Sequence, residues 1–244
     1  MTVSIDTVYQ RVLTLASKEQ RGYITPQEFN LLANHAQMEI FEQYFYDVKQ
    51  FNRIPGNATE YSDMLNILHE KIGLFEEEED NAWMITNMPT LPAPLQSYMQ
   101  IPSEIYKIGT VRIGDNQVEL MNTKDFDAAM ISPLTAPTNS RPIGTLTSKG
   151  LRVAVAKNEF ATPGDFTMNI SYIARPAEVQ WAYVVVNDKP LYNPNIAVDF
   201  ELHQSEETEL VYKILKLAGV NLKSPEMIQI GQTLEQTQNQ LEKQ

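Results

Sequence analysis

The sequence has no cysteine, 10 glycines and only 3 histidines among its 244 residues. The absence of cysteine excludes disulfides, thiolate metal sites and thiol nucleophiles. Neither a P-loop nor a dinucleotide-binding fingerprint can be written around the few glycines. No apolar run approaches the roughly 18 residues that a membrane-spanning helix needs. We therefore expect no cofactor and no membrane partner.

Basic residues are also scarce, because 19 Lys and Arg face 31 Asp and Glu and leave a formal charge of −12. Such a chain does not bind nucleic acid through its overall field. The segment Met1 to Ser17 contains charges and no apolar core, so we expect no signal peptide there.

The three histidines share no ligand spacing, and we expect no metal site from His35, His69 and His203. Asp199, Glu201 and His203 alternate beside Ser205, which together offer an acid, a base and a hydroxyl. Catalytic triads are assembled across a fold and not along one strand, so we expect Ser205 to cap a helix instead. Paired carboxylates for glycoside hydrolysis remain open, since any acidic chain contains candidates.

Three further features each have a structural and a functional interpretation. The acidic run Glu76 to Asp80 is typical of a solvated loop, or it binds cations or a basic partner. Trp83 and Trp181 are expected in a core or interface, or they form a sugar platform. The third feature is a basic segment with Arg141, Lys149, Arg152 and Lys157. It is a candidate nucleic-acid patch, but it lacks the interleaved aromatic residues on one face that are typical of such a patch.

The first 75 residues show helical patterns. We expect Asp6 to cap a first helix, and Thr25-Pro26-Gln27-Glu28 is a capping box that opens a second. Apolar residues recur from Phe29 to Phe45 at helical spacing, and a third helix is expected to end near Gly73.

The middle of the chain has a different composition. Four prolines between Met88 and Pro102 favour extended backbone and mark a boundary. Short alternating segments with turns between them predict antiparallel strands at 106–113, 118–121, 151–156, 166–173 and 179–186. A short helix is expected at 123–130, and an exposed loop from Ser132 to Arg141.

Helices return at the end of the chain, first from Ser205 to Gly219. The segment 225–244 is polar except for a narrow apolar seam of Met227, Ile230, Leu234 and Leu241. Such a seam suits a coiled-coil-like docking strip, or a tail helix packed on its own domain.

The order helical, then β, then helical predicts an α+β fold. We expect a helical bundle scaffold, made of the N- and C-terminal helices, with an inserted antiparallel β domain. The predicted parts are an N-terminal helical part at 1–90, the β domain at 91–197, and C-terminal helices with a docking tail at 198–244.

Several segments resemble a family of tailed-phage structural proteins. At the start these are Val8-Tyr9-Gln10-Arg11-Val12-Leu13 and the stretch Gly22 to Asn30. Toward the end they are Tyr172 to Pro176, Trp181 to Val186, Leu191 to Pro194, Val198 to Leu202, and Ser205-Glu206-Glu207. The family is that of the head-to-tail connectors, also called portal adaptors or ring proteins, of short-tailed bacteriophages, including the crAss-like group.

The resemblance implies a virion structural protein and not an enzyme. It implies a homo-oligomeric ring, typically a dodecamer, that lies beneath the portal protein at the head-tail junction and continues the DNA channel for genome ejection. It also implies a helical bundle with a β domain inserted, and synthesis in the host cytoplasm. Twelve copies at −12 each would total −144, and such a wall repels the DNA that passes as cargo.

Within this interpretation the apolar seam would dock on the portal, since a glutamine-rich tail has few charges to use instead. The loop from Ser132 to Arg141, with Pro133 and Pro137, would contact a neighbouring subunit, and further tail or ring proteins would bind below. The alternative is a β-domain binding or attachment module elsewhere in the phage tail. A hydrolase with dispersed carboxylates is a third hypothesis.

Overall fold

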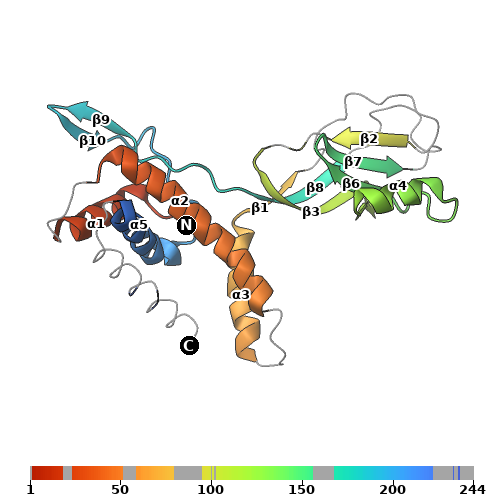
Figure 1. The fold of residues 1–244 in the computed structure, drawn as a ribbon, viewed down its shortest axis with the longest axis horizontal. Helices are drawn as coiled ribbons and strands as arrows, with labels where there is room; N and C mark the ends of the chain where they lie inside the picture. Colours follow the sequence, from red (N-terminus) through yellow and green to blue (C-terminus); the bar gives the residue numbers. More distant parts are fainter. Residues whose placement is uncertain are drawn as a thin grey trace. The chain divides into compact units, whose positions relative to one another are not determined.

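The computed structural model describes residues 2–18, 24–51, 59–79, 95–99, 101, 103–155, 168–221, 233 and 236. The chain divides into two compact units: unit 1 is Met1–Leu74 with Pro176–Gln244, and unit 2 is Phe75–Arg175 (Figure 1). The chain therefore leaves unit 1 once and returns to it. The predicted α+β class is confirmed, while the divisions between units fall at 74/75 and 175/176, where we had expected 90/91 and 197/198.

Unit 1 is mainly helical. Its elements are α1 (Ile5–Lys18), α2 (Pro26–Phe51), α3 (Thr59–Gly73), β9 (Tyr183–Val186), β10 (Lys189–Tyr192), the 3-10 helix η1 (Gln204–Glu206) and α5 (Glu207–Asn221). Helix α5 packs on α1 and α2, and α3 packs on α2. The apolar stripe of α2 forms the centre of this core, because Phe29, Ile40 and Phe41 are buried.

The capping box at the start of α2 is confirmed. Thr25 Oγ1 accepts a hydrogen bond from the Glu28 amide, and Glu28 Oε2 accepts one from the Thr25 amide at 3.0 Å. That backbone bond, together with the Thr25 hydroxyl, lowers the pKa of Glu28. The box fixes where the helix begins, at Pro26.

The expected Asp6 cap of α1 is wrong. The helix begins at Ile5, whose amide donates to Asp199 Oδ1 at 2.9 Å from the other end of the chain. Asp6 lies in the first turn, and its Oδ1 accepts a hydrogen bond from Trp181 Nε1 at 2.9 Å. Both carboxylates hold distant segments of unit 1 together.

Three amide side chains on α2 bind the extended segment 177–181. Asn30 Oδ1 and Asn34 Oδ1 accept from the amides of Trp181 and Val179, each at 2.8 Å. The same two side chains donate to the carbonyls of Trp181 and Val179 at 3.3 and 2.9 Å, and Gln37 donates to the Ala177 carbonyl at 2.8 Å. We call Asn30, Asn34 and Gln37 the amide ladder, since they take the place of a neighbouring strand.

Trp181 is buried and lies in an aromatic cluster. Its ring centroid is 4.3 Å from that of Tyr9, 5.7 Å from that of Tyr192 and 5.9 Å from that of Tyr183. Tyr9 in turn meets Phe29 edge-on at 4.7 Å. This position favours core packing over a sugar platform for Trp181; Trp83 lies outside the described residues.

Unit 2 contains two sheets, ordered β1-β8-β3-β4 and β2-β7-β6-β5, and one helix, α4 (Thr123–Ile131). The strands are β1 (Glu76–Glu79), β2 (Leu95–Met99), β3 (Ile105–Ile113), β4 (Asn116–Gln117), β5 (Glu119–Leu120), β6 (Ile143–Thr147), β7 (Gly150–Val155) and β8 (Met168–Ala174). All pairs are antiparallel except β5 with β6. The inner faces of β3, β7 and β8 share one core.

The expectation that Glu76 to Asp80 is a loop is wrong for its described part, because β1 pairs with β8 along its length. Tyr172 on β8 donates from its hydroxyl to Glu77 Oε2 at 2.7 Å. This hydrogen bond is the main reason that the pKa of Tyr172 rises to about 12. Pairing with β8 thus overrides the low strand propensity of glutamate.

Asn34→Ala is expected to lower the free energy of unfolding by about 2 to 3 kcal/mol, because it leaves the amide and carbonyl of Val179 without these hydrogen-bond partners. Urea unfolding followed by circular dichroism measures the change. His35→Ala, at the exposed next position, is the control and should cost less than about 0.5 kcal/mol. Equal losses for the two variants would contradict the ladder's role.

Tyr172→Phe is expected to cost about 1 kcal/mol at neutral pH through the lost bond to Glu77. An unfolded tyrosine ionises near pH 10, whereas folded Tyr172 holds its proton to about pH 12. The native state therefore binds the extra proton, and the wild-type advantage should fall as pH rises above 10 toward 12. Urea unfolding from pH 7 to 11 measures it, with the exposed Tyr46→Phe as control; a gap that stays constant above pH 10 would contradict the assignment.

Candidate functional site

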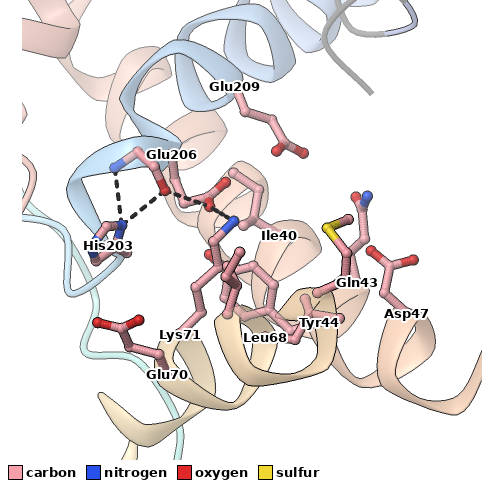
Figure 2. Close-up of a pocket in the computed structure, with 13 residues that line it drawn as sticks. Ile40, Gln43, Tyr44, Asp47, Leu68, Glu70, Lys71, His203, Glu206 and Glu209 are labelled. Carbon is pink, nitrogen blue, oxygen red and sulfur yellow. Dashed lines mark hydrogen bonds and ion pairs between the residues drawn. The ribbon is translucent and has the colours of Figure 1, made fainter. Parts of the chain in front are cut away.

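A pocket of about 330 Å³ lies in unit 1 between α2, α3 and the start of α5 (Figure 2). Its lining comprises Ile40, Gln43, Tyr44, Asp47, Met64, Ile67, Leu68, Glu70, Lys71, His203, Ser205, Glu206 and Glu209. The apolar side chains come from α2 and α3, whereas η1 and α5 contribute polar ones. The pocket is the strongest candidate among the described residues for a chemical site.

The side of the pocket next to η1 is a chain of polar contacts. Lys71 Nζ forms an ion pair with Glu206 Oε1, and Ser205 Oγ donates to the same oxygen at 3.1 Å. His203 Nδ1 lies 2.9 Å from Ser205 Oγ and accepts from the Ser205 amide at 3.2 Å. Glu206 is only 1% exposed, so its charge is stabilised by these partners and not by water.

These contacts correct the expected cap of the last helix. His203, not Ser205, is the N-cap residue of η1, and its ring nitrogen takes the role that a serine hydroxyl usually has. The α-helix α5 begins only at Glu207. Ser205 instead joins His203 to Glu206.

The order of the groups does not match serine catalysis. In a catalytic triad the histidine lies between the serine and the acid, and the acid orients the imidazole. Here Ser205 lies between His203 and Glu206, and its single hydroxyl hydrogen serves one of them. Asp199 and Glu201 accept from the amides of Ile5 and Ala177, so they are committed to the scaffold. The acids of this stretch thus bind the start of α1, the segment at Ala177 and, through Glu206, Lys71 of α3.

A second buried charge lies behind the pocket. Lys213 is 2% exposed, and its Nζ donates to Gln43 Oε1 at 3.2 Å and lies 3.5 Å from Glu209 Oε1. Glu39 Oε1 is 3.6 Å from the same nitrogen. Sequence reasoning missed this cluster, although a lysine one turn after Glu209 within the apolar face of a helix was a usable signal.

The rim retains two acids, Asp47 and Glu70, which have no ion pair among the residues described. Figure 2 places them at opposite ends of the pocket. The apolar wall of Ile40, Tyr44 and Leu68 between them contains no nucleophile. The groups here can bind a polar or cationic guest. Ser205 and His203 are in contact in this lining, but among the described residues no carboxylate orients the imidazole as in a catalytic triad.

The predicted binding residues are not part of this pocket. Met227, Ile230, Leu234 and Leu241, the predicted docking seam, lie outside the described residues. Pro133 is exposed and Pro137 is buried, while Arg141 Nη2 pairs with Glu119 Oε2 at 2.8 Å. Whether their loop contacts a neighbouring subunit stays a prediction.

The same loop contains a feature that sequence reasoning missed. Leu134 is 92% exposed and Ile131, at the end of α4, is 84% exposed. The apolar residues of an isolated loop give no sequence signal of being uncovered, because most such residues are buried in a fold. Phe126, and not Ile131 or Leu134, fills the contact between α4 and its sheet.

The basic segment is partly neutralised, since Arg141 pairs with Glu119 and Arg152 with Asp127. Within the described ranges, no group of three or more histidine, aspartate or glutamate side chains could hold a metal ion. No helix in that same portion of the chain is long and apolar enough to cross a membrane.

Comparisons with protein-family models and with curated proteins gave no match for this chain.

Lys71→Met is expected to lower the free energy of unfolding by about 3 kcal/mol, because it leaves the buried Glu206 carboxylate without its cation. Arg11→Met is the matched control, since the half-exposed Arg11 pairs with Glu207 at 3.0 Å and should cost less than about 1 kcal/mol. Urea unfolding of both variants gives the comparison. A loss for Lys71→Met no larger than the control's would show that the pair is not structurally important.

Proposed function

We propose that this protein is a non-enzymatic virion structural protein, a ring subunit that joins the portal to the tail of a short-tailed bacteriophage. The observation that carries the proposal is the discontinuous helical unit, which both ends of the chain build around an inserted β unit. This is the plan that the resemblance to head-to-tail connectors implies. The ring would continue the channel through which DNA passes.

Several of the residues that carry the resemblance have structural roles in unit 1, which supports a shared scaffold. Thr25 and Glu28 form the capping box of α2, and Asp199 binds the start of α1. Trp181 lies in the aromatic cluster, and Glu206 pairs with Lys71. Residues that fix a scaffold are the ones that we expect members of a structural family to share.

The use of charge and apolar surface also favours assembly over catalysis. Buried Glu206 pairs with Lys71 of α3, and buried Lys213 pairs with Glu209 of its own helix and with Glu39 of α2, so these charges hold elements of unit 1 together. Ile131 and Leu134 present apolar side chains at the surface of unit 2, where the predicted subunit contact lies. Exposed apolar groups of this kind are typical of protein contacts.

A β-domain attachment module elsewhere in the phage tail is the alternative function. The two sheets of unit 2 favour it, since they form a compact unit of their own. The two functions differ in the partner, because only a connector has to bind the portal. Mixing the purified protein with the cognate portal separates them.

Deletion of residues 225–244 is expected to abolish binding to the portal and leave both units folded, because α1, α2, α3 and α5 supply the buried core of unit 1. Mass photometry of protein mixed with the cognate portal measures binding, and full-length protein should add one subunit per portal subunit. Circular dichroism of the deletion variant controls for folding. Continued binding by the shortened protein would refute the docking role of the seam.

Failure of the full-length protein to bind the portal would refute the connector function itself. The attachment module would then be the better description.

A further inference from the structure

The backbone groups of residues 177–186 alternate between two sides. The N–H and C=O groups of the even residues point toward β10 and the chain that follows it. Gln180 exchanges hydrogen bonds with Val198 at 3.1 and 3.0 Å, and Ala182 accepts from Asn193 at 2.9 Å. Val184 and Val186 continue the series opposite Leu191 and Lys189. The odd residues face α2, where the amide ladder binds Ala177, Val179 and Trp181.

The amide ladder ends before the strand does. Helix α2 begins at Pro26, and Asn30 is the last side chain of the ladder toward that end. Figure 1 shows the β9–β10 hairpin extending past the first turn of α2. The outward amides and carbonyls of Tyr183 and Val185 consequently have no hydrogen-bond partner within the described residues. These two residues form an open strand edge.

The other edge of the hairpin is blunted. Pro190 lies opposite Val185, so by the same alternation its nitrogen points outward, and proline has no N–H to donate. Asn187 and Asp188 have φ values of 51° and 59°, typical of the two-residue turn that sets this register. The β10 edge therefore lacks the donor opposite Val185, whereas the β9 edge presents the N–H and C=O groups of both Tyr183 and Val185.

We propose that β9 of a second copy of this chain pairs antiparallel with this edge, about a two-fold axis at Val184. Tyr183 then lies opposite Val185 of the partner subunit, and Val185 opposite the partner subunit's Tyr183. Each of these pairs exchanges two hydrogen bonds, and Val184 faces its own copy between them. The product is one sheet in the order β10, β9 and the same two strands of the partner subunit reversed.

Length and charge select a second copy as the occupant. An added strand can be only as long as Tyr183–Val186, because beyond Trp181 the amide ladder already fills the edge. β9 has that length and then turns away at Asn187. Its four residues carry no charge, so self-pairing places no like charges opposite each other.

Burial favours the same pairing. A two-stranded sheet alone is marginal in water, and a wider one is more stable. The outer face of the hairpin holds Val184, Val186 and Leu191, each about half-exposed, and Val185 is 60% exposed on the other face. Pairing two hairpins brings these apolar side chains from both copies side by side.

This contact is distinct from those of the proposed ring. A two-fold pair closes on two copies, whereas a ring needs a head-to-tail contact between different surfaces. The inference therefore does not rest on the proposed function. Whether the wild type binds the portal is measured separately, and either result there leaves the pairing test intact.

The test is a charge swap at Val184, whose side chain is exposed and lies at the proposed axis. Sedimentation velocity over a concentration series should show dimers for the wild type. Val184→Lys alone and Val184→Glu alone should each dimerise about tenfold more weakly, because like charges then face each other. An equimolar mixture of the two variants should recover dimers. A monomeric wild type, or single variants that dimerise like it, would overturn the proposal.

Hydrogen exchange at high protein concentration gives an independent readout. The amides of Tyr183 and Val185 should become protected as dimers form, and dilution should release them. Val185→Pro removes one of these donors as Pro190 does on the other edge, and it should abolish dimers; Val185→Thr keeps the donor and should retain them. Tryptophan fluorescence in a Trp83→Phe background, where Trp181 is the remaining tryptophan, checks that the hairpin is intact. Dimers that persist in Val185→Pro with both sites unprotected would also overturn the pairing.

Discussion

Amide side chains of α2 hold the extended segment 177–181 where a neighbouring strand would otherwise lie. Asn30 and Asn34 each satisfy both the N–H and the C=O of one residue, which is what an antiparallel strand does. The spacing works because positions three or four apart lie on one helix face, while alternate strand residues point to one side. The ladder aligns the segment so that Trp181 enters the aromatic cluster and Asp199 reaches the start of α1.

The buried charges act on the same unit in a different way. Lys71 joins α3 to η1, and Lys213 joins α5 to α2, so each ion pair connects two elements that are far apart in sequence. Apolar residues of similar size often stabilise a fold as well as a buried ion pair does. An ion pair, however, requires one relative alignment of the two elements that carry its charges. The pocket beside Lys71 is the space left where three such elements meet.

Sequence patterns predicted the parts of this fold that depend on local signals. The start of α2 follows from its capping box, and the helical stripe from Phe29 to Phe45 follows from periodicity. The ladder had no such signal, because Asn30 and Asn34 resemble any polar helix positions and their partners lie about 150 residues away. The acidic strand β1 also escaped prediction, since its pairing with β8 overrides its composition.

The candidate site shows the same division. The seam of the C-terminal segment and the loop around Arg141 were named from composition, whereas the contacts of Glu206 and Lys213 needed the tertiary structure. The absence of conventional catalytic motifs could be seen in the sequence. The hydrogen-bond chain of His203, Ser205 and Glu206 could not be seen there. These residues lie within four positions of the sequence, and the conformation of η1 decides which of them are in contact.

The capping of α1 by Asp199 has a consequence for synthesis on the ribosome. The first helices emerge early, yet the carboxylate that binds the Ile5 amide and the segment that binds the amide ladder are translated more than 100 residues later. At about 5 to 20 residues per second, α1 and α2 wait roughly 10 to 40 seconds for these partners. During that interval Phe75–Arg175 emerges whole. A chain that ends at residue 175 would therefore contain the inserted unit and a helical unit that lacks both the segment bound by the amide ladder and Asp199.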